Sequence, residues 1–201
     1  LHILPCNGTK WYIPPEVPSG SHTLVHEAHM EKEVGKDKYR QLIEILLEEQ
    51  VWVSDFDIPL TGNFISPRGS MINWCPIGRK ANNKQRSYFK KFDKKVKLRN
   101  QSFSRLRLKL DSADMQDITL KFGGDTSFDI YPRGWDKTYA LRHFSDKTVW
   151  FVGDRARSPK GNDYEIAQAC GWRSFHTNGP EQTKDVIEQI EEKIRRSHGS
   201  S

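Results

Sequence analysis

An apolar run that ends on Gly-Asp constrains this chain more than any other feature. Val149–Val152 is such a run, and Gly153 and Asp154 follow it directly. A short apolar run bounded by glycine is typical of a buried strand. A polar loop then leads to Gly-Asn-Asp at 161–163 and to an apolar-periodic segment that predicts a helix over 163–170. The order strand, acidic loop, helix indicates an α/β arrangement.

Open α/β sheets bind ligands at the carboxyl ends of their strands. Asp154 places a carboxylate at such an end, beside a loop of small and polar residues. Mg²⁺ takes oxygen ligands and usually keeps waters and substrate phosphate in its shell. We therefore expect Mg²⁺ at Asp154, the alternative being a solvated loop that caps the next helix.

The cysteines and the apolar runs limit where the chain works. The three cysteines, Cys6, Cys75 and Cys170, are widely spaced and form no C-x-x-C pair. This argues for a reducing compartment, here the cytoplasm, and against a disulfide framework or a zinc site. No apolar run reaches the length of a membrane span, so we expect no membrane partner.

The formal charge is +6, and much of the excess lies between residues 84 and 109. A solvated basic helix face accounts for this, and attraction to nucleic acid or to anionic substrates is the alternative. No recognised nucleic-acid motif occurs, so we expect no nucleic-acid partner. His22, His26 and His29 would share one face of a helix and could bind zinc, but we expect a polar surface because no carboxylate or cysteine completes the set.

Periodicity and turn residues predict the other elements and two zones. Residues 18–125 read as antiparallel α+β and residues 130–201 as alternating helix and strand, with a Pro/Gly/Ser-rich hinge at 14–21. The predicted helices are 37–50, 83–110 with a break near 100–102, 135–144 and 180–196. The predicted strands are 1–4, 10–13, 63–66, 71–75, 118–122, 126–131, 149–152 and 172–176.

Three arginines surround the predicted hairpin at 63–75 and the helix after it. Arg68 and Arg79 flank the strand at 71–75, and Arg86 follows near a helix start. One guanidinium group can donate two parallel hydrogen bonds to the oxygens of a phosphate, so these arginines could form a phosphate clamp. The alternative is a few surface arginines in a basic protein.

Two further motifs could have either a functional or a purely structural role. Lys137 opens a predicted helix near the strand end that carries Asp154, where it could neutralise a carboxylate or a transferring phosphoryl group. Ser127 and Asp129 share one face of a strand, which suits recognition of sugar hydroxyls. A surface lysine and the polar face of an edge strand are the alternatives.

Together these motifs resemble the eukaryotic-type phosphomannomutases, a branch of the haloacid dehalogenase (HAD) superfamily with a large α/β cap. The resemblance is carried by RGSMINWCPIGR at 68–79, Arg86, GDTSFDIYPRGWDK at 124–137, FVGD at 151–154 and GND at 161–163. Order and spacing agree over residues 60–170, and more loosely from Leu1 to Ile194.

The resemblance implies an α/β fold with an incomplete HAD-like Rossmannoid core and an inserted α+β cap on an antiparallel sheet. Residues 1–16 would be a remnant of the core, 17–130 the cap, 131–196 the C-terminal part of the core and 197–201 a disordered tail. Arg68, Asn73, Arg79 and Arg86 would bind the phosphate and sugar of the substrate, and Ser127 and Asp129 would contact phosphate and sugar hydroxyls. Lys137 would stabilise an aspartyl-phosphate, and Asp154 would bind Mg²⁺ with Asn162 and Asp163 in support.

The implied activity is a Mg²⁺-dependent interconversion of mannose 6-phosphate and mannose 1-phosphate, through a hexose bisphosphate, in the supply of GDP-mannose. The implied assembly is a homodimer through the cap. A HAD-type sugar phosphatase, or a non-catalytic fragment that binds sugar phosphates, remains an alternative.

Two departures from the family pattern matter. The D-x-D-x-T motif with the nucleophilic Asp and the acid/base Asp does not occur in these residues, and neither does the family's Ser/Thr phosphate motif. Because the chain begins at Leu1 inside an apolar run, we expect a truncated N-terminus. Because the nucleophile motif does not occur, we expect the chain to be inactive alone. The segment after Asp163 is shorter than in the family and lacks the acid of an additional structural cation site, so we predict no second cation there.

Overall fold

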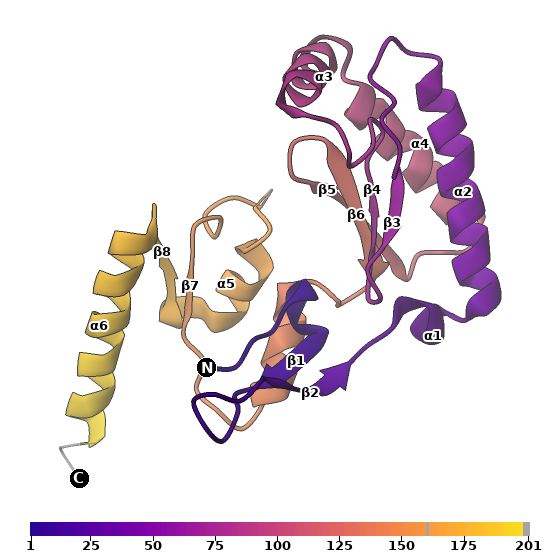
Figure 1. Ribbon diagram of the computed structural model, residues 1–201. Coiled ribbons are helices and arrows are strands. Elements are labelled where there is room, and N and C mark those ends of the chain that lie inside the picture. The colour runs from indigo at the N-terminus through magenta and orange to yellow at the C-terminus, as the bar shows by residue number, and fades with distance from the viewer. Residues whose placement is uncertain (160, 199–201) are drawn as a thin grey trace. The chain divides into compact units, whose positions relative to one another are not determined.

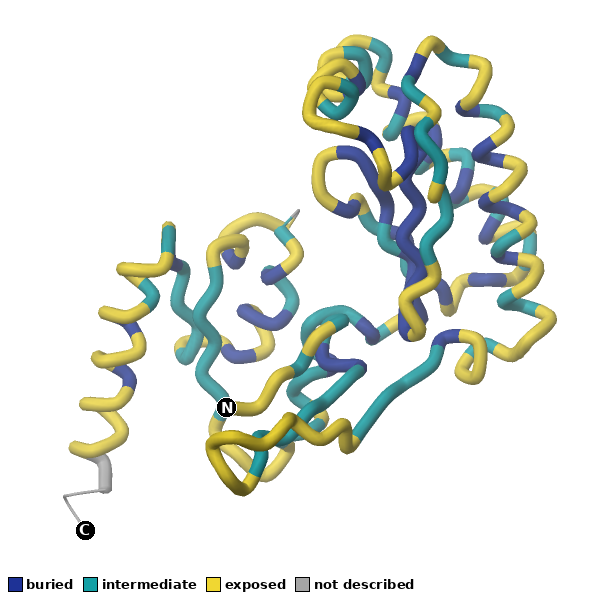
Figure 2. Tube along the Cα trace, viewed as in Figure 1, coloured by how far each residue is buried: buried dark blue, intermediate teal, exposed yellow. Residues whose placement is uncertain are grey.

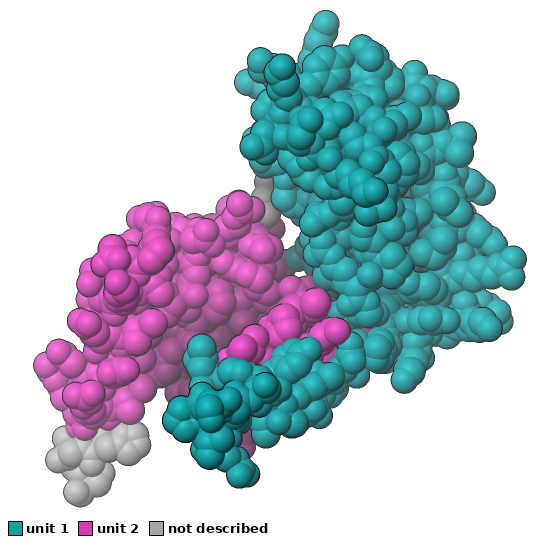
Figure 3. Space-filling model, viewed as in Figure 1, with its two compact units in different colours: residues 1, 12–133 teal, residues 2–11, 134–201 magenta. Residues whose placement is uncertain are grey.

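The computed structural model describes residues 1–159 and 161–198 and separates into two compact units. Unit 1 comprises Leu1 and Tyr12–Arg133, and unit 2 comprises His2–Trp11 and Gly134–Ser201 (Figure 3). Along the sequence, unit 1 is therefore inserted between two segments of unit 2. The assignment of cap and core roles to these residues stays a prediction.

Unit 1 is built on a four-stranded antiparallel sheet (Figure 1). Its strands follow the order β3 (Ile65–Pro67), β4 (Ile72–Trp74), β6 (Ser127–Pro132) and β5 (Ile118–Gly123). The hairpin between β3 and β4 and the pair around Gly123-Gly124 are both confirmed.

Alternation along the strands gives this sheet an apolar face and a polar face. Most residues along β4 and β6 are buried (Figure 2). The apolar ones are Ile72, Trp74, Phe128 and Ile130, with Tyr131 next to them in β6. The helices α2 (Lys36–Ser54) and α4 (Leu98–Ser112) lie against that face. Trp74 reaches α2, because its indole N–H donates to Gln50 Oε1 at 2.9 Å.

The basic segment forms two helices, α3 (Asn83–Val96) and α4, rather than one. The break lies at Lys97, so the prediction of a break near 100–102 was wrong by a few residues. Lys97 adopts a left-handed conformation (φ 60°), and its N–H closes α3 on Asp93 O at 2.7 Å. Asp93 Oδ1 then accepts the backbone N–H of Arg99 at 2.7 Å, which starts α4.

The N-terminal part differs more from the prediction. The strand predicted at 1–4 is wrong: Ile3 makes an isolated bridge only, since Leu1 and Ile3 are 96% and 44% exposed and bury no strand face. The 3₁₀ turn η1 (Cys6–Gly8) follows, and then the predicted strand β1 (Lys10–Ile13), which pairs with β2 (Thr23–Glu27). His26 lies in β2 and His29 precedes α1 (Met30–Val34), so the histidines share no helix face.

Unit 2 contains the predicted strand, loop and helix. The parallel strands β7 (Phe151–Gly153) and β8 (Ser174–His176) are joined through α5 (Tyr164–Cys170) and the short η3 (Gly171–Arg173). Parallel neighbours need such a crossover. The helix expected at 135–144 is the 3₁₀ helix η2 (Lys137–Phe144). It packs close to Gly8 (φ 87°), where a Cβ would lie 2.5 Å from Ala140 Cα.

The last helix, α6 (Pro180–His198), turns Val186 and Ile190 inward. It runs two residues into the segment predicted as a disordered tail, and residues 199–201 lie outside the described residues. No helix in the described part of the chain is long and apolar enough to cross a membrane. The predicted α/β fold class with an antiparallel sheet is confirmed.

Trp74→Phe should lower the free energy of unfolding by about 1–3 kcal/mol, because it leaves the buried Gln50 Oε1 without its donor. Urea denaturation followed by circular dichroism measures the loss. Trp52→Phe is the matched control, since no hydrogen bond of the Trp52 indole is present among the described residues. An equal loss in both variants would contradict the role given to the Trp74 hydrogen bond.

Candidate functional site

Asn73 connects the polar side chains on the open face of the unit 1 sheet. It lies on β4 and is 2% exposed. Its Nδ2 donates to Phe128 O at 3.1 Å and to Asp129 Oδ1 at 2.7 Å, and its Oδ1 accepts from Arg79 Nη1 at 3.3 Å. One buried amide thus links a guanidinium to a carboxylate and uses its own polar groups to do so.

Ser127 and Asp129 share a face of β6, as predicted, and both lie against Gly123 of β5. A Cβ at Gly123 would lie 2.8 Å from Asp129 Cγ. The buried Ser127 hydroxyl donates to Gly123 O. Glycine at 123 therefore leaves the space that the Asp129 carboxylate occupies.

Arg86 is held firmly at the start of α3. Its Nε donates to Ala81 O at 3.0 Å, its Nη1 to Thr126 Oγ1 at 3.0 Å and its Nη2 to Arg79 O at 3.2 Å. The guanidinium is half-buried, and its remaining N–H groups are available to an anion. Arg86 is thus fixed in orientation before any ligand arrives.

The structure brings together five of the six predicted substrate-binding residues of unit 1: Asn73, Arg79, Arg86, Ser127 and Asp129. The sixth, Arg68, lies on the β3–β4 turn, where its backbone N–H donates to Met71 O at 2.8 Å. Its exposed side chain has no hydrogen bond or ion pair among the described residues.

The polar residues of unit 2 centre on Asp163, which is 2% exposed. Asp163 Oδ1 forms an ion pair with Lys137 Nζ, and its Oδ2 accepts the backbone N–H of Arg155 at 3.2 Å. A Cβ at Gly153 would lie 2.7 Å from Asp163 Oδ2, so glycine is needed at the end of β7. Asp163 is therefore bound to the chain itself and holds Lys137 in place.

Asp154 and Asn162 are exposed, and their side chains make no hydrogen bond or ion pair with the described residues. No group of three or more His, Cys, Asp or Glu side chains in the described part of the chain could hold a metal ion. A single free carboxylate beside β7 still suits Mg²⁺, which is bound through one or two carboxylates and keeps waters and substrate phosphates. Asp154 fits that donor set.

Sequence reasoning missed three residues that shape the unit 1 cluster: Gly123, Thr126 and Arg99. Thr126 is 4% exposed and accepts from Arg86, while its carbonyl oxygen accepts from the Cys75 thiol at 3.4 Å. Thr126 precedes Ser127 within the motif at 124–137, so that motif could have indicated Thr126 as a further site residue. Arg99 lies 25 residues before the turn it contacts, and no local pattern indicates that pairing.

Several side chains of the basic segment at 84–109 are paired within unit 1. These ion pairs are Lys90–Asp125, Arg99–Asp93, Arg105–Glu49, Arg107–Asp111 and Lys109–Glu48. Burial raises the pKa of the Glu49 carboxyl, and Arg105 opposes that rise. Part of the basic excess therefore stabilises the packing of α2 and α4.

Solved structures with the same fold support this description. The chain aligns with a truncated IMP-nucleotidase of Plasmodium falciparum at a TM-score of 0.55 and 13% identity, over 92% of this chain and 48% of the other. An IMP-bound mutant of the same protein gives a TM-score of 0.56 at 14% identity, over 92% and 47%. At these identities the likeness shows the fold alone, an α/β fold.

The family is shown by sequence. The model of eukaryotic phosphomannomutase matches residues 19–193. Phosphomannomutase 1 of Dictyostelium discoideum is 36% identical over 173 residues (84% of this chain, 67% of the relative), and the phosphomannomutase of Schizosaccharomyces pombe 41% over 137 residues (66% and 51%). The chain thus spans about half to two thirds of the length of these relatives. On the family match and these identities, the chain belongs to the eukaryotic phosphomannomutase family.

Proposed function

We propose that this chain provides the substrate-binding part, and half of the phosphoryl-transfer site, of a Mg²⁺-dependent mutase that interconverts mannose 6-phosphate and mannose 1-phosphate. Family membership supports the proposal. The observation that carries it is the array in which buried Asn73 joins Arg79 to Asp129, with Arg86 fixed alongside. Guanidinium groups beside a carboxylate suit a ligand that carries both phosphate and hydroxyl groups.

In this proposal unit 1 is the cap. Arg79 and Arg86 bind the phosphate that does not react, and Arg68 joins them from the hairpin turn. The carboxylate of Asp129 accepts a hydrogen bond from a sugar hydroxyl, and the Ser127 hydroxyl holds β6 to β5 through Gly123 O. Asn73 keeps Arg79 and Asp129 at a constant separation and acts chiefly by positioning them.

Unit 2 is then part of the HAD-like core. Asp154 would hold Mg²⁺, with Asn162 nearby, and the ion would offset negative charge on the transferring phosphoryl group. Lys137, oriented by Asp163, adds a positive charge to the same group. An aspartate carboxylate oxygen bonds to phosphorus while the bond from phosphorus to the sugar oxygen breaks, and a second acid protonates that oxygen.

The attacking aspartate has no candidate among these residues. Asp55 and Asp57 have the D-x-D spacing, but Pro59 replaces the threonine, and the pair follows α2 rather than a buried strand. Asp57 Oδ2 also accepts from the Tyr88 hydroxyl at 2.9 Å. We propose that a D-x-D-x-T segment outside these residues supplies the nucleophile, in a cytoplasmic enzyme that dimerises through unit 1.

Joining this chain to an N-terminal segment that contains D-x-D-x-T should yield Mg²⁺-dependent conversion of mannose 1-phosphate to mannose 6-phosphate in the presence of a hexose bisphosphate. The 201-residue chain alone should show none, and its turnover would contradict the proposed source of the nucleophile. Release of free phosphate would identify a sugar phosphatase instead. Sugar-phosphate binding without turnover in both proteins would identify a non-catalytic binding module.

Arg86→Ala should weaken mannose 1-phosphate binding roughly 10- to 100-fold, because hydrogen bonds to charged groups contribute about 1.5–3 kcal/mol. Isothermal titration calorimetry on the 201-residue chain measures the effect. Arg107→Ala is the matched control, since Arg107 lies on α4 and pairs with Asp111. Unchanged affinity in Arg86→Ala would contradict the clamp.

Gly123→Ala should displace the Asp129 carboxylate and weaken mannose 1-phosphate binding more than binding of inorganic phosphate, because Asp129 contacts the sugar in this proposal. Comparing the two ligands by calorimetry separates the sugar contribution from the phosphate contribution. Gly179→Ala is the control, since nothing lies within 4 Å of the added Cβ. Equal loss for both ligands would argue against a sugar contact at Asp129.

A further inference from the structure

We infer that Arg99 is a positioning residue for the sugar-phosphate site. It holds the turn between β5 and β6 from the helix side of the sheet, and that turn keeps Arg86 and Asp129 in place. The inference rests on the proposed function, because it concerns the same site. Arg99 lies on α4 and belongs to none of the motifs that indicated the site.

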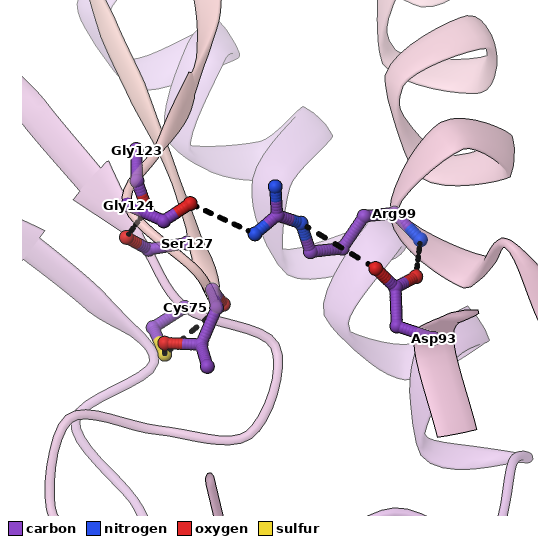
Figure 4. A network of polar contacts seen from close by, with 7 residues as sticks. Cys75, Asp93, Arg99, Gly123, Gly124 and Ser127 are labelled. Atoms are coloured by element: carbon purple, nitrogen blue, oxygen red, sulfur yellow. Dashed lines mark hydrogen bonds and ion pairs between the residues drawn. The ribbon is translucent and has the colours of Figure 1, made fainter. Parts of the chain in front are cut away.

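The contacts of Arg99 fix both ends of its side chain (Figure 4). Its Nη1 donates to Gly124 O at 3.0 Å, and its Cζ lies 4.9 Å from the Phe122 ring centroid and 5.8 Å from that of Phe128. Asp93 Oδ2 lies 3.9 Å from Arg99 Nε, while Asp93 Oδ1 accepts the backbone N–H of Arg99. The guanidinium thus lies over two aromatic rings of the sheet and donates to one carbonyl group.

This arrangement is costly, which suggests that it serves a purpose besides packing. The Arg99 side chain is 12% exposed, and burial lowers the pKa of its guanidinium, although Asp93 and Asp125 oppose that shift. Its buried Nε has no hydrogen-bond partner among the described residues. A buried donor without a partner costs free energy, and an apolar side chain here would avoid that cost.

The turn that Arg99 holds is shared by two of the proposed binding residues. Thr126 Oγ1 accepts from Arg86 Nη1 at 3.0 Å, so a shift of the turn moves the Arg86 guanidinium. Gly123 lies against Asp129 and accepts the Ser127 hydroxyl, so the same shift moves the carboxylate. Arg99 acts on both from the apolar face, while the ligand would meet the polar face.

A lysine at this position would keep the charge but not the geometry. The guanidinium lies over the Phe122 ring while one of its N–H groups donates to Gly124 O, and an ammonium group cannot do both equally well. Arg99→Lys should therefore recover only part of what Arg99→Ala loses. Such partial rescue is expected of a positioning role and not of a simple charge effect.

Arg99→Ala and Arg99→Lys should be compared with Arg105→Ala in the full 201-residue chain. Arg105 is a close match: it also lies on α4, stacks over Trp52 at 4.1 Å and pairs with a carboxylate, Glu49. Both alanine variants should lose stability toward urea. We expect Arg99→Ala to weaken mannose 1-phosphate binding roughly ten-fold, Arg99→Lys less, and Arg105→Ala not at all, by calorimetry at a temperature where circular dichroism shows each folded.

A second readout separates this inference from the proposed function. Arg99→Ala should shift the ¹H–¹⁵N signals of the Arg86 side chain and the Thr126 amide without any ligand, and Arg105→Ala should not. Equal shifts in both variants, or wild-type affinity in Arg99→Ala, would overturn the positioning role. A wild-type chain that does not bind mannose 1-phosphate would overturn the proposed function, and the NMR signals alone would then decide whether Arg99 orients Arg86.

Discussion

The register between β4 and β6 is the constraint on which the rest of unit 1 depends. It pairs Trp74 with Phe128 and Asn73 with Asp129. The rings of Trp74 and Phe128 stack on the side of the helices, with their centroids 5.0 Å apart. Asn73 donates a hydrogen bond to Asp129 on the opposite side of the sheet. Because strand side chains alternate, a slip of β6 by one residue would turn Phe128 to the polar face and Asp129 to the side of the helices. The burial of Trp74 and Phe128 therefore also aligns the candidate site.

Most of the sheet could be predicted from the sequence because its signals are local. Proline and glycine mark the β3–β4 turn, and Gly123-Gly124 marks the β5–β6 turn. The errors arose where local preference was overridden. Lys97 breaks the basic helix because Asp93 closes one helix and starts the next, and nothing about lysine itself predicts a left-handed conformation. Leu1–Leu4 looked like a strand by composition, but no partner strand among the described residues buries it.

The candidate site could also be predicted only where its signals are local in the sequence. Motif spacing predicted Arg79, Arg86, Asp129 and Lys137 as site residues, because functional groups of these kinds are recognisable by type. It did not show that both polar groups of the Asn73 amide are hydrogen-bonded within unit 1, or that Asp163 forms an ion pair with Lys137. Nor did it show that Gly123 and Arg99 shape the β5–β6 turn. These facts depend on contacts between residues distant in sequence, which only the folded chain brings together. The proposed metal site rests on the position of Asp154 at the end of β7 as well as on the family resemblance, and the proposed nucleophile rests on the resemblance alone.

The Asn73 amide also gives the site a direction. Its NH₂ group faces Asp129, and its oxygen faces Arg79, so an acceptor must lie on one side and a donor on the other. The amide cannot turn over to suit the reverse order, because the same NH₂ group donates to the backbone oxygen of Phe128. A main-chain carbonyl, which no substitution of a side chain removes, thus determines which side is positive and which is negative. Exchanging Arg79 and Asp129 would preserve the net charge of this surface and still leave its polarity incompatible with the strand beneath it.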